Sequence, residues 1–164
     1  MKTVIMIRHA KSSWANQLQS DFERPLNDRG NKDAPKMAEK LLAKHIQIDA
    51  FISSTAIRAK QTCEHFCHVF GVDLKAIQWK DELYHASSST IHQVLAETND
   101  QYQKIAVFCH NPGITEFVND LVEDVMIDDL PTCGVFAVSA AIEHWRDFST
   151  AKKTYMFFEY PKQH

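Results

Sequence analysis

The chain has 164 residues, of which 45% are hydrophobic and 24% are charged, and its formal net charge is −3. These values are typical of a soluble globular protein and suffice for one domain over residues 1–164. The slight negative charge gives no reason to expect nucleic acid or an anionic membrane as a partner, and no apolar run is long enough to span a membrane. We therefore expect a cytoplasmic protein with no nucleic-acid or membrane partner, either a monomer or a weak dimer.

Strand and helix patterns alternate along most of the chain. Apolar, β-branched runs predict strands at 3–7, 50–53, 76–79 and 105–109. A polar loop over 11–30 precedes a helix with Pro35 near its start and with one apolar face, formed by Ala34, Met37, Ala38, Leu41 and Leu42. Further helices are predicted at 57–70, 90–97 and 114–123, and a loop at 81–89. This alternation favours a mostly parallel sheet that is covered by helices on both faces.

The last quarter of the chain has a different pattern. Three short runs at 135–140, 144–148 and 154–160 are predicted as strands joined by turns. Strands joined by turns pair antiparallel, so they would form one edge of the sheet. The predicted fold is therefore an α/β protein with three layers, α/β/α, whose mostly parallel sheet has an antiparallel C-terminal edge.

Cysteine and histidine spacing does not indicate a metal site. The four cysteines form no C-x-x-C pair and are interpreted as free thiols in a reducing compartment. The nine histidines are scattered, and His65 and His68 are the only pair at helical spacing. A histidine-rich metal-binding protein is therefore a minor alternative, and no metal or cofactor is expected.

Cations and imidazoles follow three of the predicted parallel strands. Arg8 and His9 come directly after the first strand, Arg58 lies in the helix after the second, and His110 follows the 105–109 strand. Because parallel strands end on one side of a sheet, these four side chains are expected to meet there. Arginine forks bind phosphate strongly, and an imidazole is a base and nucleophile near neutral pH. The pattern predicts a site for phosphoryl chemistry.

The same segments resemble the histidine phosphatase superfamily, which includes the cofactor-dependent phosphoglycerate mutases. Arg8-His9-Ala10 resembles its Arg-His-Gly signature, residues 54–62 its Ser-Pro-x-x-Arg-Ala-x-Gln-Thr segment, and residues 109–113 its second-histidine motif. Within the superfamily, residues 8–12, the segment from Asp21 to Gly30 and residues 131–134 look most like the SixA-type phosphohistidine phosphatases. The resemblance covers about residues 1–140 and implies the phosphoglycerate mutase-like fold.

Two positions depart from the family pattern. Ala10 stands where the family has glycine, and Thr55 stands where it has proline. Alanine costs little at position 10 if the backbone there has a negative φ. Neither change removes a group that would bond to phosphate, so activity is expected to be retained.

The resemblance implies a mechanism and assigns residues to it. His9 would be the nucleophile and would form a phosphohistidine that water then hydrolyses. Arg8, Arg58 and His110 would bind the phosphoryl group and stabilise its charge, with no metal ion required. Lys11 is a candidate further substrate-binding cation at the rim, with an exposed loop lysine as the equal alternative.

Glu82 is the candidate proton donor to the leaving group, with Asp81 as the fallback and a plain surface carboxylate as the alternative. The short segments between the motifs leave little chain for a lid, which favours a phosphorylated protein over a small phosphorylated metabolite. If the substrate is phosphohistidine, a proton donor matters less, because imidazole leaves readily. A small-molecule phosphomonoesterase or mutase of the same superfamily remains the enzymatic alternative. A phosphate-binding interaction module is the non-enzymatic one, although binding alone would not need His9.

Overall fold

The computed structural model describes residues 1–162 and is built around a six-stranded sheet with the order β3-β2-β4-β1-β5-β6. Its strands are β1 (Lys2–Arg8), β2 (Ala50–Ser53), β3 (Gln78–Trp79), β4 (Lys104–Cys109), β5 (Val135–Ala140) and β6 (Lys153–Glu159). The pairs β1–β4, β2–β4 and β2–β3 are parallel, whereas β1–β5 and β5–β6 are antiparallel. The predicted parallel sheet with an antiparallel C-terminal edge is therefore confirmed.

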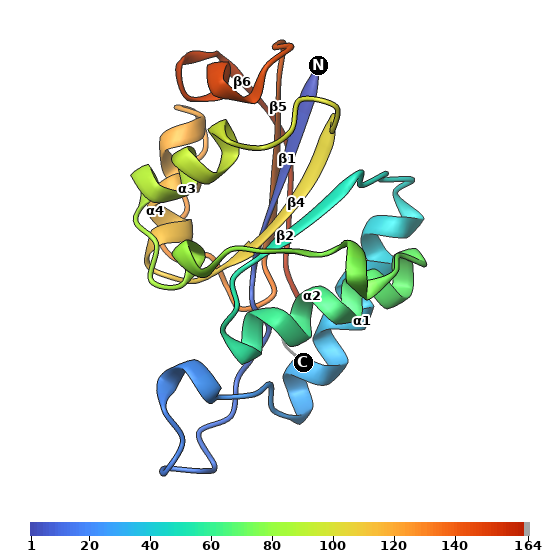
Figure 1. Cartoon of the computed structure of the whole chain (residues 1–164), viewed down its shortest axis with the longest axis vertical. Helices are drawn as coiled ribbons and strands as arrows, with labels where there is room; N and C mark the ends of the chain where they lie inside the picture. Colours follow the sequence, from blue (N-terminus) through green and yellow to red (C-terminus); the bar gives the residue numbers. More distant parts are fainter. Residues whose placement is uncertain (163–164) are drawn as a thin grey trace.

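Helices cover both faces of this sheet and produce three layers (Figure 1). On one face α1 (Asp28–Ala43) and α2 (Ile57–Phe70) pack on Ile5, Ile7 and Phe108. On the other face α3 (Ser88–Ala96) and α4 (Gly113–Leu121) pack on Val4, Met6 and their neighbours. Both faces of β1 are buried, which explains why its sequence is a continuous apolar run rather than an alternating one.

The central strands are tied together where they end. Phe108 of β4 stacks on Phe51 at a centroid distance of 6.4 Å and meets the edge of Phe66 at 5.2 Å. Each such aromatic pair contributes about 0.5–1.5 kcal/mol beyond the area it buries. The Ser54 amide also donates to the Phe108 carbonyl over 3.0 Å. This packing holds the carboxyl ends of β2 and β4 at the same level of the sheet.

Helix α1 starts earlier than its sequence pattern predicts. The Asn27 side chain accepts a hydrogen bond from the Gly30 amide over 2.9 Å, so the helix begins at Asp28 and Pro35 lies in its middle. Gly30, predicted as part of the loop, fits here because a Cβ on it would lie 2.2 Å from the Lys11 carbonyl oxygen. Leu42, predicted on the apolar face, is 46% exposed.

The segment predicted as a strand at 144–148 is a 3-10 helix, Trp145–Thr150. Trp145 and Phe148 are both buried, and side chains three residues apart lie on one face of a 3-10 helix. A strand would instead have placed Trp145 and Asp147 on the same face. The prediction was wrong because one pair of buried aromatic residues is too little to establish a periodicity, and their three-residue spacing is that of a 3-10 turn rather than of a strand.

The remaining elements differ from their predicted bounds only at the ends. Residues 74–76 form a 3-10 helix before the short β3, and Ser87 caps α3. All four cysteines are free, as expected, and all four are buried. Within residues 1–162, every helix is too short or too polar to cross a membrane.

Candidate active site

The ends of β1 and β4 bring the two candidate histidines together. Arg8 pairs with Cys109 in the parallel register, and the His9 amide donates to the Cys109 carbonyl over 3.2 Å. His9 and His110 therefore follow neighbouring strands at the same level, with ring centroids 5.2 Å apart. Residues separated by about a hundred positions in the sequence thus meet at the carboxyl ends of the central parallel strands, as predicted.

The His9 ring is oriented by its own backbone. Its Nδ1 lies 2.7 Å from the Ala10 carbonyl oxygen, which can only accept, so Nδ1 carries the hydrogen. The Ala10 amide in turn donates to Thr62 Oγ1 over 2.9 Å. In the neutral ring this tautomer leaves the lone pair on Nε2, the atom that would attack phosphorus. Ala10 does not have a positive φ, so alanine replaces the family glycine here without backbone strain.

Burial and nearby cations keep the His9 ring neutral. Burial, together with the smaller effects of the Arg58 and Arg8 charges, lowers the pKa of His9 to about 3 against the raising effect of the Ala10 hydrogen bond. A protonated imidazole has no lone pair to attack with. The environment therefore holds His9 in its nucleophilic form throughout the physiological pH range.

Arg58 reaches His9 from the first turn of α2. Its Nε lies 3.4 Å from His9 Nε2, and its side chain is nearly buried. The other two nitrogens are held by Asp21, with Nη1 donating to the backbone carbonyl over 2.7 Å and Nη2 to the carboxylate over 3.0 Å. The guanidinium is therefore fixed in place rather than free in solvent.

The sequence analysis did not predict the role of Asp21 as an organising residue. Its carboxylate accepts hydrogen bonds from Arg58, from Arg24 over 2.8 Å and from the Tyr84 hydroxyl over 2.6 Å. Burial raises the pKa of Asp21, but the hydrogen bonds from Tyr84 and Arg24 and the charge of Arg58 together hold it well below its usual range. The sequence shows Asp21 and Arg24 in the same loop, but their spacing does not indicate which side chains Asp21 contacts in the folded protein.

Arg8 is anchored on the opposite side of the cavity. Its Nη1 donates to the Leu130 carbonyl over 2.8 Å and lies 3.8 Å from the exposed carboxylate of Asp129. Burial and the charge of Arg58 lower the pKa of Arg8, and Asp129 opposes them. The Nε of Arg8 is buried and has no hydrogen-bond partner among the described residues. A buried donor without a partner is costly, so Nε is available to an incoming acceptor.

His110 is neutral in this environment. Its Nε2 lies 2.7 Å from Ser54 Oγ, and its Nδ1 is buried without a partner among the described residues. Burial lowers the pKa of His110 to about 2, and His9 and Arg58 contribute to this shift. A protonated His110 would stabilise phosphoryl charge better than the neutral ring does, but burial disfavours that form. An anion beside the ring would have to raise the pKa first.

These side chains surround a cavity of about 300 Å³. Its lining includes three of the predicted residues at its base (Arg8, His9 and Arg58) and Lys11 at its exposed rim, together with Ser12, Trp14, Arg24, Asn111 and Thr132. Of the predicted set, His110 is not among the residues that line this cavity, and its ring lies beside that of His9.

The structure does not bring Glu82 to this cavity. Glu82 lies on a 3-10 helix, Asp81–Leu83, whose buried residue is Leu83, so the Glu82 side chain is exposed. The fallback, Asp81, accepts a hydrogen bond from Thr55 over 2.6 Å. The residue of this segment that does reach the site is Tyr84, through Asp21. The prediction of an acid at this position therefore gains no support from the geometry.

The metal-binding alternative gains no support either. His65 Nε2 lies 2.9 Å from the Asn31 side-chain oxygen. Over residues 1–162, the structure contains no group of three or more His, Cys, Asp or Glu side chains that could hold a metal ion.

Comparison with known proteins agrees with this site. The model of the histidine phosphatase superfamily (branch 1) matches residues 4–104, a range that includes His9 and Arg58 and ends before His110. Because this match covers more than half of the chain, the chain belongs to the histidine phosphatase superfamily.

The individual relatives differ in what their names say. The uncharacterized protein Rv1276c of Mycobacterium tuberculosis is 28% identical over 165 residues, covering 95% of this chain and 100% of the relative. A 2,3-bisphosphoglycerate-dependent phosphoglycerate mutase of Mesorhizobium japonicum is 30% identical over 80 residues, 47% of this chain and 39% of the mutase. A structure from Agrobacterium tumefaciens, assigned as the phosphohistidine phosphatase SixA, has a TM-score of 0.83 and 27% identity, covering 98% of this chain and 99% of that one.

Proposed function

We propose that the protein is a metal-independent phosphatase that removes phosphate from phosphohistidine on a protein partner, through a phosphohistidine intermediate on His9. The observation that carries the proposal is the surroundings of His9 Nε2. This nitrogen carries the lone pair of a ring kept neutral by burial, accepts a long hydrogen bond of 3.4 Å from Arg58 Nε, and belongs to a cavity that Arg8 also lines.

The two steps follow from these positions. His9 Nε2 attacks phosphorus in line, a new N–P bond forms, and the N–P bond to the substrate imidazole breaks. The bonding pair goes to the substrate ring, which carries a proton from solvent on its other nitrogen and therefore leaves as neutral imidazole. Arg8 and Arg58 bind the equatorial oxygens, where charge concentrates during transfer. Water then attacks the phosphorus bound to His9, releases inorganic phosphate and restores the neutral ring. The overall reaction consumes one water and yields histidine and phosphate.

The absence of an acid in the cavity favours a phosphoramidate substrate. None of the described residues that line the cavity is Asp or Glu, and Glu82 points to solvent. Asp21 is close to the arginines, but its lowered pKa keeps it ionised and unable to donate a proton. An alkoxide leaving group needs such a proton, whereas an imidazole leaves readily. This lining supports phosphohistidine over an alkyl phosphomonoester and over the mutase alternative.

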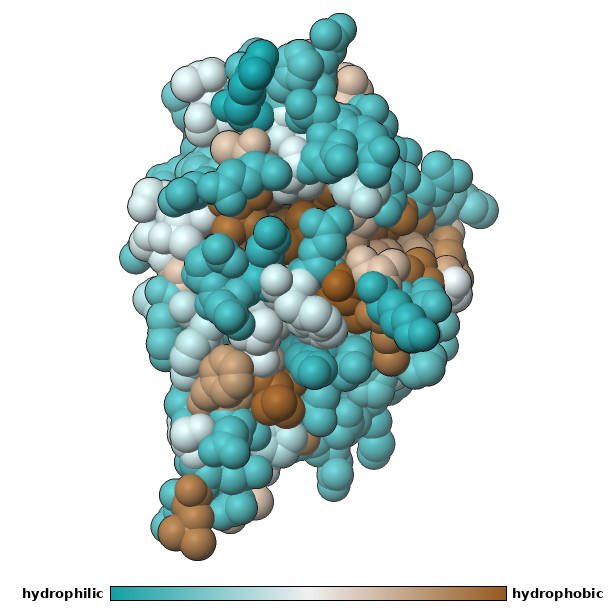
Figure 2. All heavy atoms as spheres, in the orientation of Figure 1, coloured by the Kyte–Doolittle hydropathy of each residue, from teal (hydrophilic) through white to brown (hydrophobic). Residues whose placement is uncertain are grey.

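The surface beside the cavity favours a protein as the carrier of that phosphohistidine. The loop between β1 and α1 projects from the body of the molecule (blue in Figure 1), and Figure 2 shows hydrophobic atoms exposed at its tip. Trp14 is 74% exposed and Leu18 is 97% exposed. Trp14 also lines the cavity, with its ring 3.3 Å from the Arg24 guanidinium carbon. Exposed apolar side chains at the rim of a cavity are suited to contact with another protein.

Turnover of a phosphohistidine peptide tests the proposal. The wild-type protein, His9→Ala and the exposed-site control His68→Ala are compared with a phosphohistidine peptide and with p-nitrophenyl phosphate, each with and without EDTA. Wild type and His68→Ala are expected to hydrolyse the peptide with EDTA present, and His9→Ala to be inactive. Acid-labile, base-stable phosphate on the wild-type enzyme would identify the intermediate.

Three results would contradict the proposal. Wild-type turnover by His9→Ala would show that His9 is not the nucleophile. Turnover of p-nitrophenyl phosphate without turnover of the phosphohistidine peptide would exclude the proposed substrate and indicate a phosphomonoesterase. Tight phosphate binding by wild type without any turnover would indicate the non-enzymatic alternative.

A further inference from the structure

We propose that a basic groove, running from the catalytic cavity along α1, binds an acidic segment of the phosphoprotein substrate. This inference rests on the proposed function and adds to it a preference for particular substrates. The groove is defined here by Lys11, Arg29, Lys36, Lys40 and Lys162, which line three adjoining cavities.

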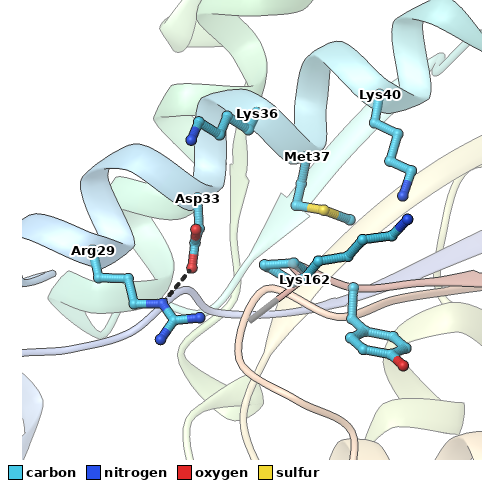
Figure 3. A pocket seen from close by; sticks show the side chains of 8 residues that line it. Arg29, Asp33, Lys36, Met37, Lys40 and Lys162 are labelled. Atoms are coloured by element: carbon cyan, nitrogen blue, oxygen red, sulfur yellow. Dashed lines mark hydrogen bonds and ion pairs between the residues drawn. The ribbon is translucent and has the colours of Figure 1, made fainter. Parts of the chain in front are cut away.

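The groove is continuous with the site of chemistry. The catalytic cavity shares Lys11 and Thr132 with a second cavity of about 140 Å³. That second cavity shares Arg29 and Tyr160 with a third cavity of about 330 Å³ on the side of α1 (Figure 3). A substrate whose phosphate lies beside His9 can therefore extend its chain through Lys11 to α1 without leaving the hollowed surface.

Positive charge predominates along this path. The five cations face two carboxylates, since Asp33 lies 3.4 Å from Arg29 and Glu159 lies 2.7 Å from Lys40. Lys11 and Lys36 form no ion pair with any described residue. In Figure 3 the amine ends of Lys40 and Lys162, which line the same cavity, point toward one another. This positive excess lies on a chain whose net charge is −3, so it is a local feature.

The dimensions and the floor of the groove suit a polypeptide. Arg29, Asp33, Lys36 and Lys40 follow the i, i+4, i+7, i+11 spacing of one helix face. From Arg29 to Lys40 this face is about 17 Å long, which is the length of about five residues of extended chain. The floor includes buried Met37, and half-exposed Tyr160 lies beside it. A small phosphorylated metabolite would not reach from His9 to these lysines.

Binding of peptides without phosphate isolates the groove from the chemistry. The probe is a fluorescein-labelled peptide in which a histidine is followed, after a three-residue spacer, by five glutamates. A second probe has the reverse order, and a third has glutamine in place of each glutamate. Anisotropy at low salt is measured with wild type, the double variant Arg29→Gln/Lys36→Gln, and the control Lys75→Gln/Lys152→Gln, which removes two exposed lysines outside α1 and the groove.

We expect wild type and the control to bind at least one glutamate probe about tenfold more tightly than they bind the glutamine probe. The double variant is expected to bind that glutamate probe about tenfold more weakly than wild type does. When the histidine of each probe is phosphorylated, kcat/KM of the double variant is expected to fall by a similar factor for the glutamate peptide and to stay unchanged for the glutamine peptide. Turnover of p-nitrophenyl phosphate by the double variant is expected to equal that of wild type. Equal binding by wild type and the double variant would overturn the inference, as would an equal loss in the control.

Failure of the proposed function would look different. If no phosphohistidine peptide is hydrolysed but the double variant still loses binding of the glutamate probe, the groove is an acidic-segment site and the proposed chemistry is wrong. If the peptides are hydrolysed at rates that ignore the glutamates, and binding does not change in the double variant, the chemistry holds and the groove is not a binding site.

Discussion

Acidification should destabilise the fold through the two site histidines. The folded state lowers the pKa of His9 to about 3 and of His110 to about 2, mainly by burial, whereas an unfolded histidine titrates near 6.5. Between pH 6.5 and pH 3 the unfolded chain binds both protons and the folded chain does not. The stability associated with the neutral rings is therefore fully present above pH 6.5 and is lost as the pH falls below it.

The size of this effect follows from the unfolded-state titration alone. At pH 5.5 about ten of every eleven unfolded imidazoles are protonated, which favours unfolding by about 1.4 kcal/mol per buried histidine relative to pH 7.5. Two such residues give about 3 kcal/mol. Losses of this size are a large fraction of the stability of an ordinary domain.

Urea unfolding at pH 7.5 and pH 5.5, in a buffer without phosphate or sulfate, measures the loss. The double variant His9→Asn/His110→Asn is expected to lose about 3 kcal/mol less than wild type between these two pH values. His68→Asn keeps both site histidines and is expected to lose as much as wild type. His65 and His92, whose pKa values burial also lowers, are present in every protein compared and cancel. An identical loss in wild type and the double variant would refute the reasoning.

Three substitutions test other parts of the site. Arg58→Lys keeps the charge but loses the fork that contacts Asp21 and His9, so kcat/KM should fall about 100-fold or more in the peptide assay; a loss under fivefold would contradict the assigned role. Glu82→Gln should change kcat/KM on a phosphohistidine peptide less than twofold, and a large loss would restore Glu82 as the acid. Gly113→Ala would place a Cβ 1.8 Å from the Ala86 carbonyl oxygen and should lower the free energy of unfolding by about 3 kcal/mol or more, measured in urea; wild-type stability would mean that this backbone contact is loose.

The sheet was predictable from sequence because burial on both faces leaves a clear pattern. The runs Val4–Ile7 and Ile105–Cys109 are apolar throughout, and that is the signature of central parallel strands. Short segments were less predictable. Trp145 and Phe148 supply too few positions to distinguish a 3-10 helix from a strand, so tertiary packing decided their structure. The start of α1 depends on the Asn27 cap, a local hydrogen bond that the loop composition concealed.

The meeting of Arg8, His9, Arg58 and His110 could be predicted because the topology places each at the carboxyl end of a parallel strand or directly after one. The roles of Asp21 and Tyr84 could not be predicted in this way. They come from loops, whose course depends on individual hydrogen bonds, such as those from Arg58 and Tyr84 to Asp21. The misplacement of Glu82 has the same origin, because one residue of shift in a 3-10 turn decides whether Leu83 or Glu82 faces the interior.

The charge balance of the site follows from three arginines, two neutral histidines and the carboxylate of Asp21. The Asp21 carboxylate contacts both Arg24 and Arg58, and its own partners keep it ionised. The remaining positive charge acts on the imidazoles, which stay neutral because protonation would add charge to a buried cationic cluster. A phosphoryl dianion reverses this balance. It offsets the guanidinium charges, provides an acceptor for the unpartnered Nε of Arg8, and makes protonation of His110 favourable only once substrate is present. In the proposed mechanism, His9 is thereby neutral before binding, and His110 gains its proton only when the phosphate offers charge to stabilise it.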